Sequence, residues 1–200
     1  MSALTNVSAN IWRWDGVDVD QGFPIVGYVV PGEKGILLVD PPATSGTVEE
    51  IKACGEPEAI VLTSGWHVRG TAKWRDVFNV PIVAPSSAAS ELAEVGAKAD
   101  KVVGEGDEFN GWRVLLFEAG KFSEVAYWHA ASSTVIIGDL LTQREDGELA
   151  LGPTLFFGLT KEDVVPFVKR LIELEPKRLL SAHIGPRENV VQMLSGLLDD

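Results

Sequence analysis

The segment EAIVLTSGWHVRG, residues 58–70, decides the fold of this chain. Its first part, Ala59 to Thr63, is short, apolar and rich in β-branched residues, which predicts a buried strand. Residues 71–78 carry the pattern of a helix, so the stretch before them is predicted to be a loop. A buried strand that leads through a loop into a helix is typical of parallel strands joined by crossover connections.

The same alternation extends outward from this segment in both directions. Three strands are predicted before it, at residues 11–14, 23–30 and 36–39. The turn at 31–35 joins the last two strands as a hairpin. Thr44 or Ser45 is the predicted cap of a short helix that runs through Ala53. A strand at 81–84 and a helix at 86–95 are predicted after the segment.

The second half of the sequence predicts a similar set of elements. Four strands are expected, at residues 112–118, 125–129, 134–138 and 179–182. Residues 146–158 are predicted to form an irregular loop. Thr160 then caps a helix in which Pro166 either distorts the first turn or delays the start. With a final helix at 188–198, the pattern predicts two similar sheet-and-helix halves.

Composition narrows the class of protein. A chain of 200 residues with 46% hydrophobic and 23% charged residues is expected to form one globular domain, residues 1–200. Its formal net charge of -12 repels phosphate groups, so neither nucleic acid nor an anionic membrane is an expected partner. Cys54 is the only cysteine, which excludes an intramolecular disulfide and a cysteine-based zinc site. The sequence shows no signal-peptide pattern and no membrane-spanning apolar run, and a cytoplasmic location is predicted.

Polar side chains that could carry chemistry follow the ends of predicted strands. His67 and His183 lie just past two such ends, and Asp139 follows the strand at 134–138. This edge of an α/β sheet is where ligands usually bind. His129, the third histidine, lies within a predicted strand and is interpreted as a structural residue.

The order and spacing of five segments resemble the metallo-β-lactamase superfamily. The segments are Gly27–Val30, Leu37–Asp40, Ile60–Thr63, Gly138–Asp139 and Ala182–Pro186. The likeness covers nearly the whole chain. It implies the α/β fold of that superfamily, a four-layer αβ/βα sandwich, and it implies the label of a hydrolase.

That family places a His-x-His-x-Asp-His run directly after the strand that ends in Thr. In this chain the four ligand positions of the run are occupied by Ser64, Trp66, Val68 and Arg69. Tryptophan and valine offer no donor lone pair, and arginine is cationic, so none of these residues is an ordinary metal ligand. The family's next histidine usually follows a Pro-Gly pair, and Lys121 stands near that place.

The resemblance retains two ligand positions of the family's seven, since Asp139 matches the bridging aspartate and His183 the last histidine. Two dications about 3.5–4 Å apart need several anionic ligands, so no dinuclear centre and no cofactor is expected. Arg69 or Lys121 is predicted to pair with Asp139 in the former metal cavity. Six residues are predicted to line this cavity: Asp40, Ser64, Trp66, His67, Arg69 and Lys121.

Alternatives remain open at several of these positions. His67, Asp139 and His183 could together hold one zinc or another divalent metal, whereas the simpler interpretation leaves His67 one position away and facing the loop surface. Ser64 as a nucleophile is disfavoured, because no Gly-x-Ser-x-Gly elbow surrounds it. Asp40 is expected to orient neighbours or cap a turn. Trp66 and Trp74 could line a pocket.

Two functions from different classes follow. The favoured one is a protein without a working metal site that binds a small anionic ligand of unknown identity through Arg69 and Lys121. The other is a hydrolase of an ester, thioester, lactone or phosphoester that uses one metal, with Asp139 and His183 as catalytic residues. A homodimer is also expected, because the N-terminal strand and residues 149–157 would otherwise expose apolar area.

Overall fold

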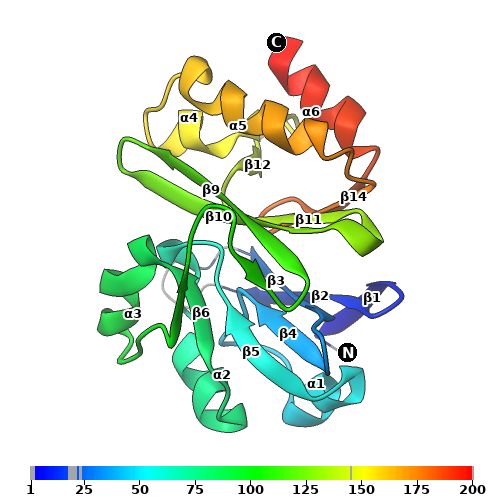
Figure 1. Cartoon of the computed structure of the whole chain (residues 1–200), viewed down its shortest axis with the longest axis vertical. Helices are drawn as coiled ribbons and strands as arrows, with labels where there is room; N and C mark the ends of the chain where they lie inside the picture. The colour runs from blue at the N-terminus through cyan, green and yellow to red at the C-terminus, as the bar shows by residue number, and fades with distance from the viewer. Residues whose placement is uncertain (1–2, 18–21, 23, 145, 200) are drawn as a thin grey trace. The chain divides into compact units, whose positions relative to one another are not determined.

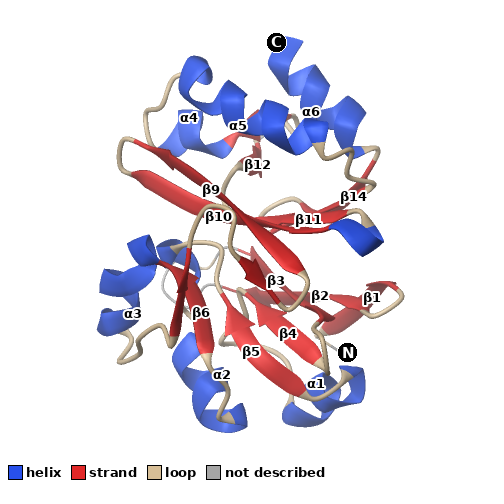
Figure 2. Cartoon of the chain, viewed as in Figure 1, coloured by secondary structure: helices blue, strands red, loops and turns tan. Residues whose placement is uncertain are grey.

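The computed structural model describes residues 3–17, 22, 24–144 and 146–199. The chain falls into two compact units, Met1–Gly104 and Glu105–Asp200 (Figure 1). Each unit contains one large β-sheet with helices packed on it (Figure 2). The predicted α/β class and the two sheet-and-helix halves are therefore confirmed.

The first unit is built on a seven-stranded sheet in sequence order, β1-β2-β3-β4-β5-β6-β7. Its strands are β1 (Leu4–Ser8), β2 (Ile11–Val17), β3 (Pro24–Pro31), β4 (Ile36–Val39), β5 (Pro57–Val61), β6 (Ile82–Pro85) and β7 (Lys101–Val103). The pairs from β1 to β4 are antiparallel, and those from β4 to β7 are parallel. Since parallel strands end at the same edge, the loops after β4, β5 and β6 meet there.

Three helices provide the crossovers between the parallel strands of the first unit. They are α1 (Val48–Cys54), α2 (Thr71–Phe78) and α3 (Ala89–Glu94), with short 3-10 turns η1 (Gly65–His67) and η2 (Ser86–Ala88) before α2 and α3. Their buried residues Ile51, Trp74 and Leu92 join the strand residues in one apolar core. The helix before β5 was expected to begin at Thr44 or Ser45, but its cap is Thr47. That expectation is wrong because the Thr44 and Ser45 hydroxyls bond to the backbone of β2 instead.

The second unit is built on a six-stranded sheet in the order β15-β14-β11-β10-β9-β8. Its strands are β8 (Glu108–Phe109), β9 (Trp112–Ala119), β10 (Phe122–His129), β11 (Thr134–Ile137), β14 (Arg178–Ser181) and β15 (Gly185–Glu188), with the turn η3 (Ala130–Ser132) between β10 and β11. Among the described residues of this sheet, the β11–β14 pair is parallel and the other pairs are antiparallel. The helix α5 (Lys161–Glu173) connects β11 to β14, and it packs with α6 (Val190–Asp199) over the apolar core.

Two predictions for the second unit need correction. Residues 146–158 are not an irregular loop, because they contain strand β13 (Leu149–Leu151), which pairs with β12 (Leu141–Gln143), and helix α4 (Gly152–Phe156). The helix capped by Thr160 begins at Lys161 and includes Pro166, so the proline does not delay its start. The Thr160 hydroxyl accepts a bond from the Asp163 amide, and the Asp163 carboxylate accepts one in return, which fixes this start.

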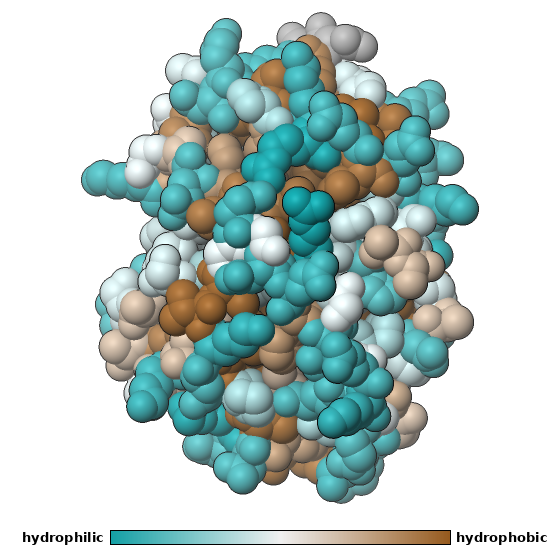
Figure 3. Space-filling view, viewed as in Figure 1, coloured by the Kyte–Doolittle hydropathy of each residue, from teal (hydrophilic) through white to brown (hydrophobic). Residues whose placement is uncertain are grey.

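The surface seen in Figure 3 is mostly hydrophilic, with smaller hydrophobic areas between polar side chains. Within the described ranges, no helix combines the length and the apolar character needed to cross a membrane. Residues 18–21 lie outside the described residues. So does Phe23, the first residue of the strand predicted at 23–30.

Candidate functional site

In the first unit, the polar residues of the candidate site are held by Asp40, which directly follows β4. Its carboxylate is buried, with the residue 8% exposed, and accepts two hydrogen bonds from Thr63. These bonds come from the backbone amide at 2.9 Å and the hydroxyl at 2.6 Å. A Cβ on Gly27 would lie 2.5 Å from the Asp40 carbonyl oxygen, so only glycine lets β3 pass this close. The loops after β4 and β5 are thus joined by a buried acid.

The same carboxylate orients His67, which lies in η1 and is only 6% exposed. His67 Nδ1 lies 3.0 Å from Asp40 Oδ2 and 2.9 Å from the Thr63 hydroxyl. A carboxylate beside Nδ1 favours the tautomer that carries its proton there, so that Nε2 bears the lone pair. His67 therefore does not face the loop surface, as the simpler sequence interpretation held, but is buried and oriented.

The four residues at the family's ligand positions have separate environments. Val68 is 7% exposed and belongs to the apolar core of the first unit, whereas Trp66 is 51% exposed. Ser64 is fully buried, and the described residues provide no hydrogen-bond partner for its hydroxyl. Arg69 is half-buried. The loop therefore uses its former ligand positions for packing and surface contacts.

In the second unit, the buried acid is Glu124 on β10, which sequence analysis missed. Glu124 is 0% exposed, and its carboxylate accepts bonds from the backbone amides of Gly138 at 2.9 Å and Asp139 at 2.5 Å. A Cβ on Gly152 would lie 2.1 Å from the Asp139 carbonyl oxygen, so helix α4 begins directly against this turn. The turn after β11 is thereby fixed from two sides.

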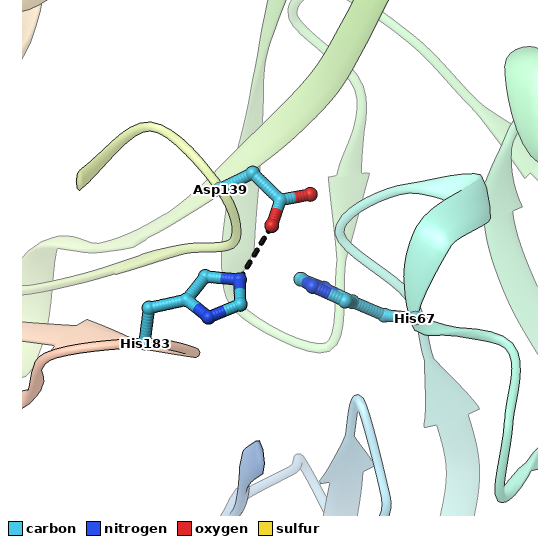
Figure 4. Close-up of side chains that lie close together, drawn as sticks. All are labelled: His67, Asp139 and His183. Carbon is cyan, nitrogen blue, oxygen red and sulfur yellow. Dashed lines mark hydrogen bonds and ion pairs between the residues drawn. The ribbon is translucent and has the colours of Figure 1, made fainter. Parts of the chain in front are cut away.

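Asp139 and His183 are bonded directly to each other, as the dashed line in Figure 4 shows. The distance from His183 Nε2 to Asp139 Oδ1 is 2.5 Å, and the side chains are 25% and 14% exposed. His183 follows β14, where its amide and that of Ile184 donate to the Ser181 hydroxyl at 3.3 and 3.4 Å. The two side chains that follow the ends of the parallel strands β11 and β14 are thus brought together, as their sequence positions predicted.

The comparisons with known proteins decide the family. A family model described as Metallo-beta-lactamase superfamily matches residues 3–185. The chain belongs to this superfamily. No curated protein matches the chain.

Solved structures, two of them metallo-beta-lactamases, share the fold of this superfamily member at low sequence identity. DIM-1 metallo-beta-lactamase is 17% identical with a TM-score of 0.74, covering 98% of this chain and 94% of that one. A metallo-beta-lactamase from Pontibacter korlensis is 18% identical with a TM-score of 0.73 and covers 98% of each chain. TTHA1623, solved in a di-iron-bound form, is 20% identical with a TM-score of 0.64, covering 90% of this chain and 96% of that one. Identities this low show the fold alone.

The residues of this chain do not fit the two-metal centre of the superfamily. Trp66 and Val68 have no donor atom for a metal. Val68 also packs in the apolar core, where removal of its side chain would leave a cavity. The donor groups that remain among the described residues are His67, Asp139 and His183. Two imidazoles and one carboxylate are too few anionic ligands for two dications, although they match the ligand number of a single catalytic zinc.

Other sequence predictions about the site are changed by the structure. Lys121 is exposed in the tight turn between β9 and β10, and the described part of the second unit records no ion pair between it and Asp139. Trp74 was predicted as a pocket wall, but it is 1% exposed and donates its indole N–H to the Pro42 carbonyl at 2.7 Å. Both corrections have one cause, because proximity in sequence does not fix the direction of a side chain.

His129 is a structural residue, as its place within a strand predicted. Its ring stacks on Trp112 with centroids 4.8 Å apart, and Nδ1 lies 2.8 Å from the Ser132 hydroxyl. Burial lowers the pKa of His129 below its usual value.

Proposed function

We propose that this superfamily member has lost the inherited metal chemistry and binds a small anionic ligand, with Arg69 as the recognising cation. The observation that supports the loss is the bond between His183 Nε2 and Asp139 Oδ1 at 2.5 Å. A proton held between these atoms occupies the Nε2 lone pair of His183 and one oxygen of the Asp139 carboxylate. A metal would have to displace that proton and break a charge-assisted bond before it gained the Nε2 atom of His183 as a ligand.

The charge of Arg69 supports the anionic class of the ligand. Arg69 is half-buried, occupies the position of a family histidine ligand and carries a guanidinium cation. A guanidinium binds carboxylates and phosphates through two parallel hydrogen bonds, which gives both strength and orientation.

Two measurements test this proposal. The metal content of the purified chain, grown with added zinc, manganese and iron and never exposed to chelators, is expected to be far below one equivalent by elemental mass spectrometry. Thermal unfolding is expected to shift upward with phosphate or acetate, and Arg69→Met should abolish the shift. Lys121→Met is the matched control, because Lys121 is exposed. Equal shifts in the chain and in Arg69→Met would contradict the role of Arg69.

A second candidate function is a hydrolase that uses one metal ion, held by His67, Asp139 and His183. The observation that favours it is the buried Asp40–His67 pair, because histidines that bind metals usually donate their other nitrogen to a carboxylate. When bound, such a metal supplies an activated water for attack on an ester, thioester, lactone or phosphoester. Asp139 would orient that water.

The same metal measurement separates the two candidates. About one equivalent of metal that is lost in His67→Ala, Asp139→Ala and His183→Ala would establish the hydrolase candidate and overturn the metal-free one. His129→Ala is the control, since this histidine bonds Ser132 and stacks on Trp112. Retention of metal by His67→Ala would remove His67 from the ligand set.

A homodimer in the cytoplasm is proposed from the sequence alone. One basis for the dimer has changed, because Trp14 on the N-terminal strand β2 is 0% exposed and needs no partner chain to bury it. The other basis is the segment 149–157, in which Leu155 and Phe156 are 46% and 68% exposed. Light scattering coupled to size exclusion tests the dimer, and a mass of one chain at working concentration would contradict it.

A further inference from the structure

The short helix α4 of the second unit holds two apolar side chains in solvent. Leu155 is 46% exposed and Phe156 is 68% exposed. The start of the helix is fixed by the Gly152 amide, which donates a hydrogen bond of 3.0 Å to the loop after β11. Directly after the helix, Phe157 packs edge-on against Phe122 with ring centroids 4.8 Å apart. Because α4 is anchored at both ends, Leu155 and Phe156 form a fixed apolar projection.

A groove lies on the same unit, between strand β13 and helix α6. It has a volume of about 300 Å³ and is lined by Glu148, Leu149, Met193, Gly196 and Leu197. Helices α4, α5 and α6 lie on one face of the second sheet, so the projection and the groove belong to the same layer (Figure 1). Strand β13 contacts both α4 and α6, and it therefore connects the two features within one unit.

Gly196 widens this groove on the side formed by α6. Met193, Gly196 and Leu197 lie about one turn apart and so share one face of the helix. Glycine within a helix is unfavourable relative to alanine, so its presence there needs a reason. An added Cβ at Gly196 would meet no described atom within 4 Å, which means that the packing of its own chain does not require glycine. The missing side chain instead leaves room for a group from outside the chain.

The projection and the groove carry opposite charges at their margins. Lys121 is exposed in the turn between β9 and β10. Its neighbour Phe122 contacts Phe157, which places Lys121 near the end of α4. Glu148 is exposed at the margin of the groove. A cation beside the projection and an acid beside the groove are electrostatically complementary, and such complementarity favours one partner and one orientation.

The second unit therefore carries both halves of one contact. We propose that a second copy of this chain is the partner, with Phe156 of each copy inserted beside Gly196 of the other. A twofold axis forms this contact twice, since each copy supplies one projection and one groove, and it brings Lys121 of one copy toward Glu148 of the other. This inference rests on the homodimer proposed above, and it names the surface through which the dimer forms.

Analytical ultracentrifugation of the full chain over a range of concentrations tests this surface, and the expected species is a dimer. Phe156→Ser should raise the dissociation constant of the dimer about tenfold or more, because aromatic residues that fill a pocket carry much of the binding energy of an interface. Val102→Ser is the matched control, since Val102 is 58% exposed on strand β7 of the first unit. This control should leave the dissociation constant unchanged.

Gly196→Leu tests the groove without weakening the helix that carries it. The leucine side chain should fill the groove and raise the dissociation constant by about tenfold, the loss expected when a central contact of an interface is removed. Leucine favours a helix far more than glycine does, so circular dichroism should show that the helix content is retained. A loss of the dimer in this variant then cannot be attributed to unfolding.

An exchange of charges tests the orientation of the two copies. Lys121→Glu and Glu148→Lys should each raise the dissociation constant roughly tenfold, because like charges then face each other across the interface. The two changes in one chain restore the opposite charges and should return the constant close to that of the unaltered chain. A double variant that dimerises no better than the single ones would overturn the proposed arrangement.

Other outcomes would overturn this inference, and they separate it from the homodimer itself. A dimer that is unaffected by Phe156→Ser and Gly196→Leu would leave the homodimer standing and place its interface elsewhere. A chain that stays monomeric at every concentration would contradict both the surface and the homodimer. If such a monomer binds phosphatidylcholine vesicles and Phe156→Ser abolishes this binding, the projection contacts lipid. Assemblies that grow beyond two copies would show that the projection and the groove do not close around a twofold axis.

Discussion

In the first unit a buried carboxylate bonds an imidazole at Nδ1, whereas in the second unit the imidazole bonds a carboxylate at Nε2. Asp40 orients His67 from the core side and leaves Nε2 as the nitrogen with the lone pair. Asp139 bonds His183 at Nε2. The first unit has thus lost the family's ligand residues but retains a buried carboxylate, Asp40, that orients a histidine. The second unit retains two of the family's ligand residues, Asp139 and His183, which are bonded to each other.

The buried acids behind these pairs differ as well. Asp40 contacts the side chains of Thr63 and His67 in addition to one backbone amide, whereas the two bonds of Glu124 to the turn after β11 go to backbone amides. The bonds of Asp40 in the first unit are therefore sensitive to changes of the neighbouring side chains. The bonds of Glu124 in the second unit depend on the path of the backbone. Four predictions test this difference.

The largest effect is expected for Glu124→Ala. The change leaves one buried and one partly buried backbone amide without this acceptor and opens a cavity, so the free energy of unfolding should fall by about 3 kcal/mol. Chemical denaturation measures it, and Glu118→Ala, at an exposed position of β9, is the control. A loss no larger than that of the control would show that the turn after β11 holds its shape without Glu124.

A smaller loss, about 2 kcal/mol, is expected for Asp40→Asn. Asparagine tolerates the positive φ of 44° at this position, so the change removes charge and one acceptor without adding backbone strain. Because the bond to His67 is also weakened, the His67 ring should become mobile. Nitrogen-15 spectra of the imidazole follow that motion, with Asp76→Asn on the exposed side of α2 as control. An unchanged His67 signal would separate Asp40 from the orientation of His67.

Asp139→Asn should lower the free energy of unfolding by about 1 kcal/mol, because the bond to His183 is charge-assisted but partly exposed to solvent. The same spectra should identify opposite tautomers in the unaltered chain, with the proton on Nδ1 in His67 and on Nε2 in His183. Finding the same tautomer in both histidines would break the comparison between the two units. A metal-bound His183 would lack the Nε2 proton altogether.

The smallest effect is expected at His129, whose pKa is lowered by burial. The unfolded chain binds this proton more readily than the folded one, so stability should rise with pH between the lowered pKa and the usual histidine pKa. His129→Gln should remove that rise, because glutamine does not titrate. Unfolding measured at several pH values from 4.5 to 7.5 tests it, and a slope unchanged in His129→Gln would assign the titration to another group.

The sequence predicted the positions that depend on strand ends. Asp40, His67, Asp139 and His183 all follow predicted strands, and the structure places each at such an end. This succeeds because the carboxyl edge of a parallel sheet collects the loops that follow its strands. The limits of α2 and β4 were predicted to the residue, since both have clear periodicity and adjoining turn signals.

Glu124 was missed because its partners depend on strand pairing. The β10–β11 pairing brings residue 124 beside Gly138 and Asp139, and no local pattern specifies that pairing. One signal was available, since Glu124 alternates with Phe122 and Ala126 on one buried face of β10. An acid on an otherwise apolar strand face needs a partner, and it predicts a polar contact without saying which.

The position of Val68 bears on whether the lost metal centre could be regained in evolution or by design. Its side chain packs in the same apolar core as Trp74 and Ile60, where the family has the aspartate of its ligand run. An aspartate placed there would bury an unpaired charge at a cost of several kcal/mol, comparable to the whole stability of many domains. A single substitution at this position would therefore lower the stability of the core, and metal binding could offset that loss only after the other ligands had also been restored. For this reason we expect the loss of the metal centre to be difficult to reverse.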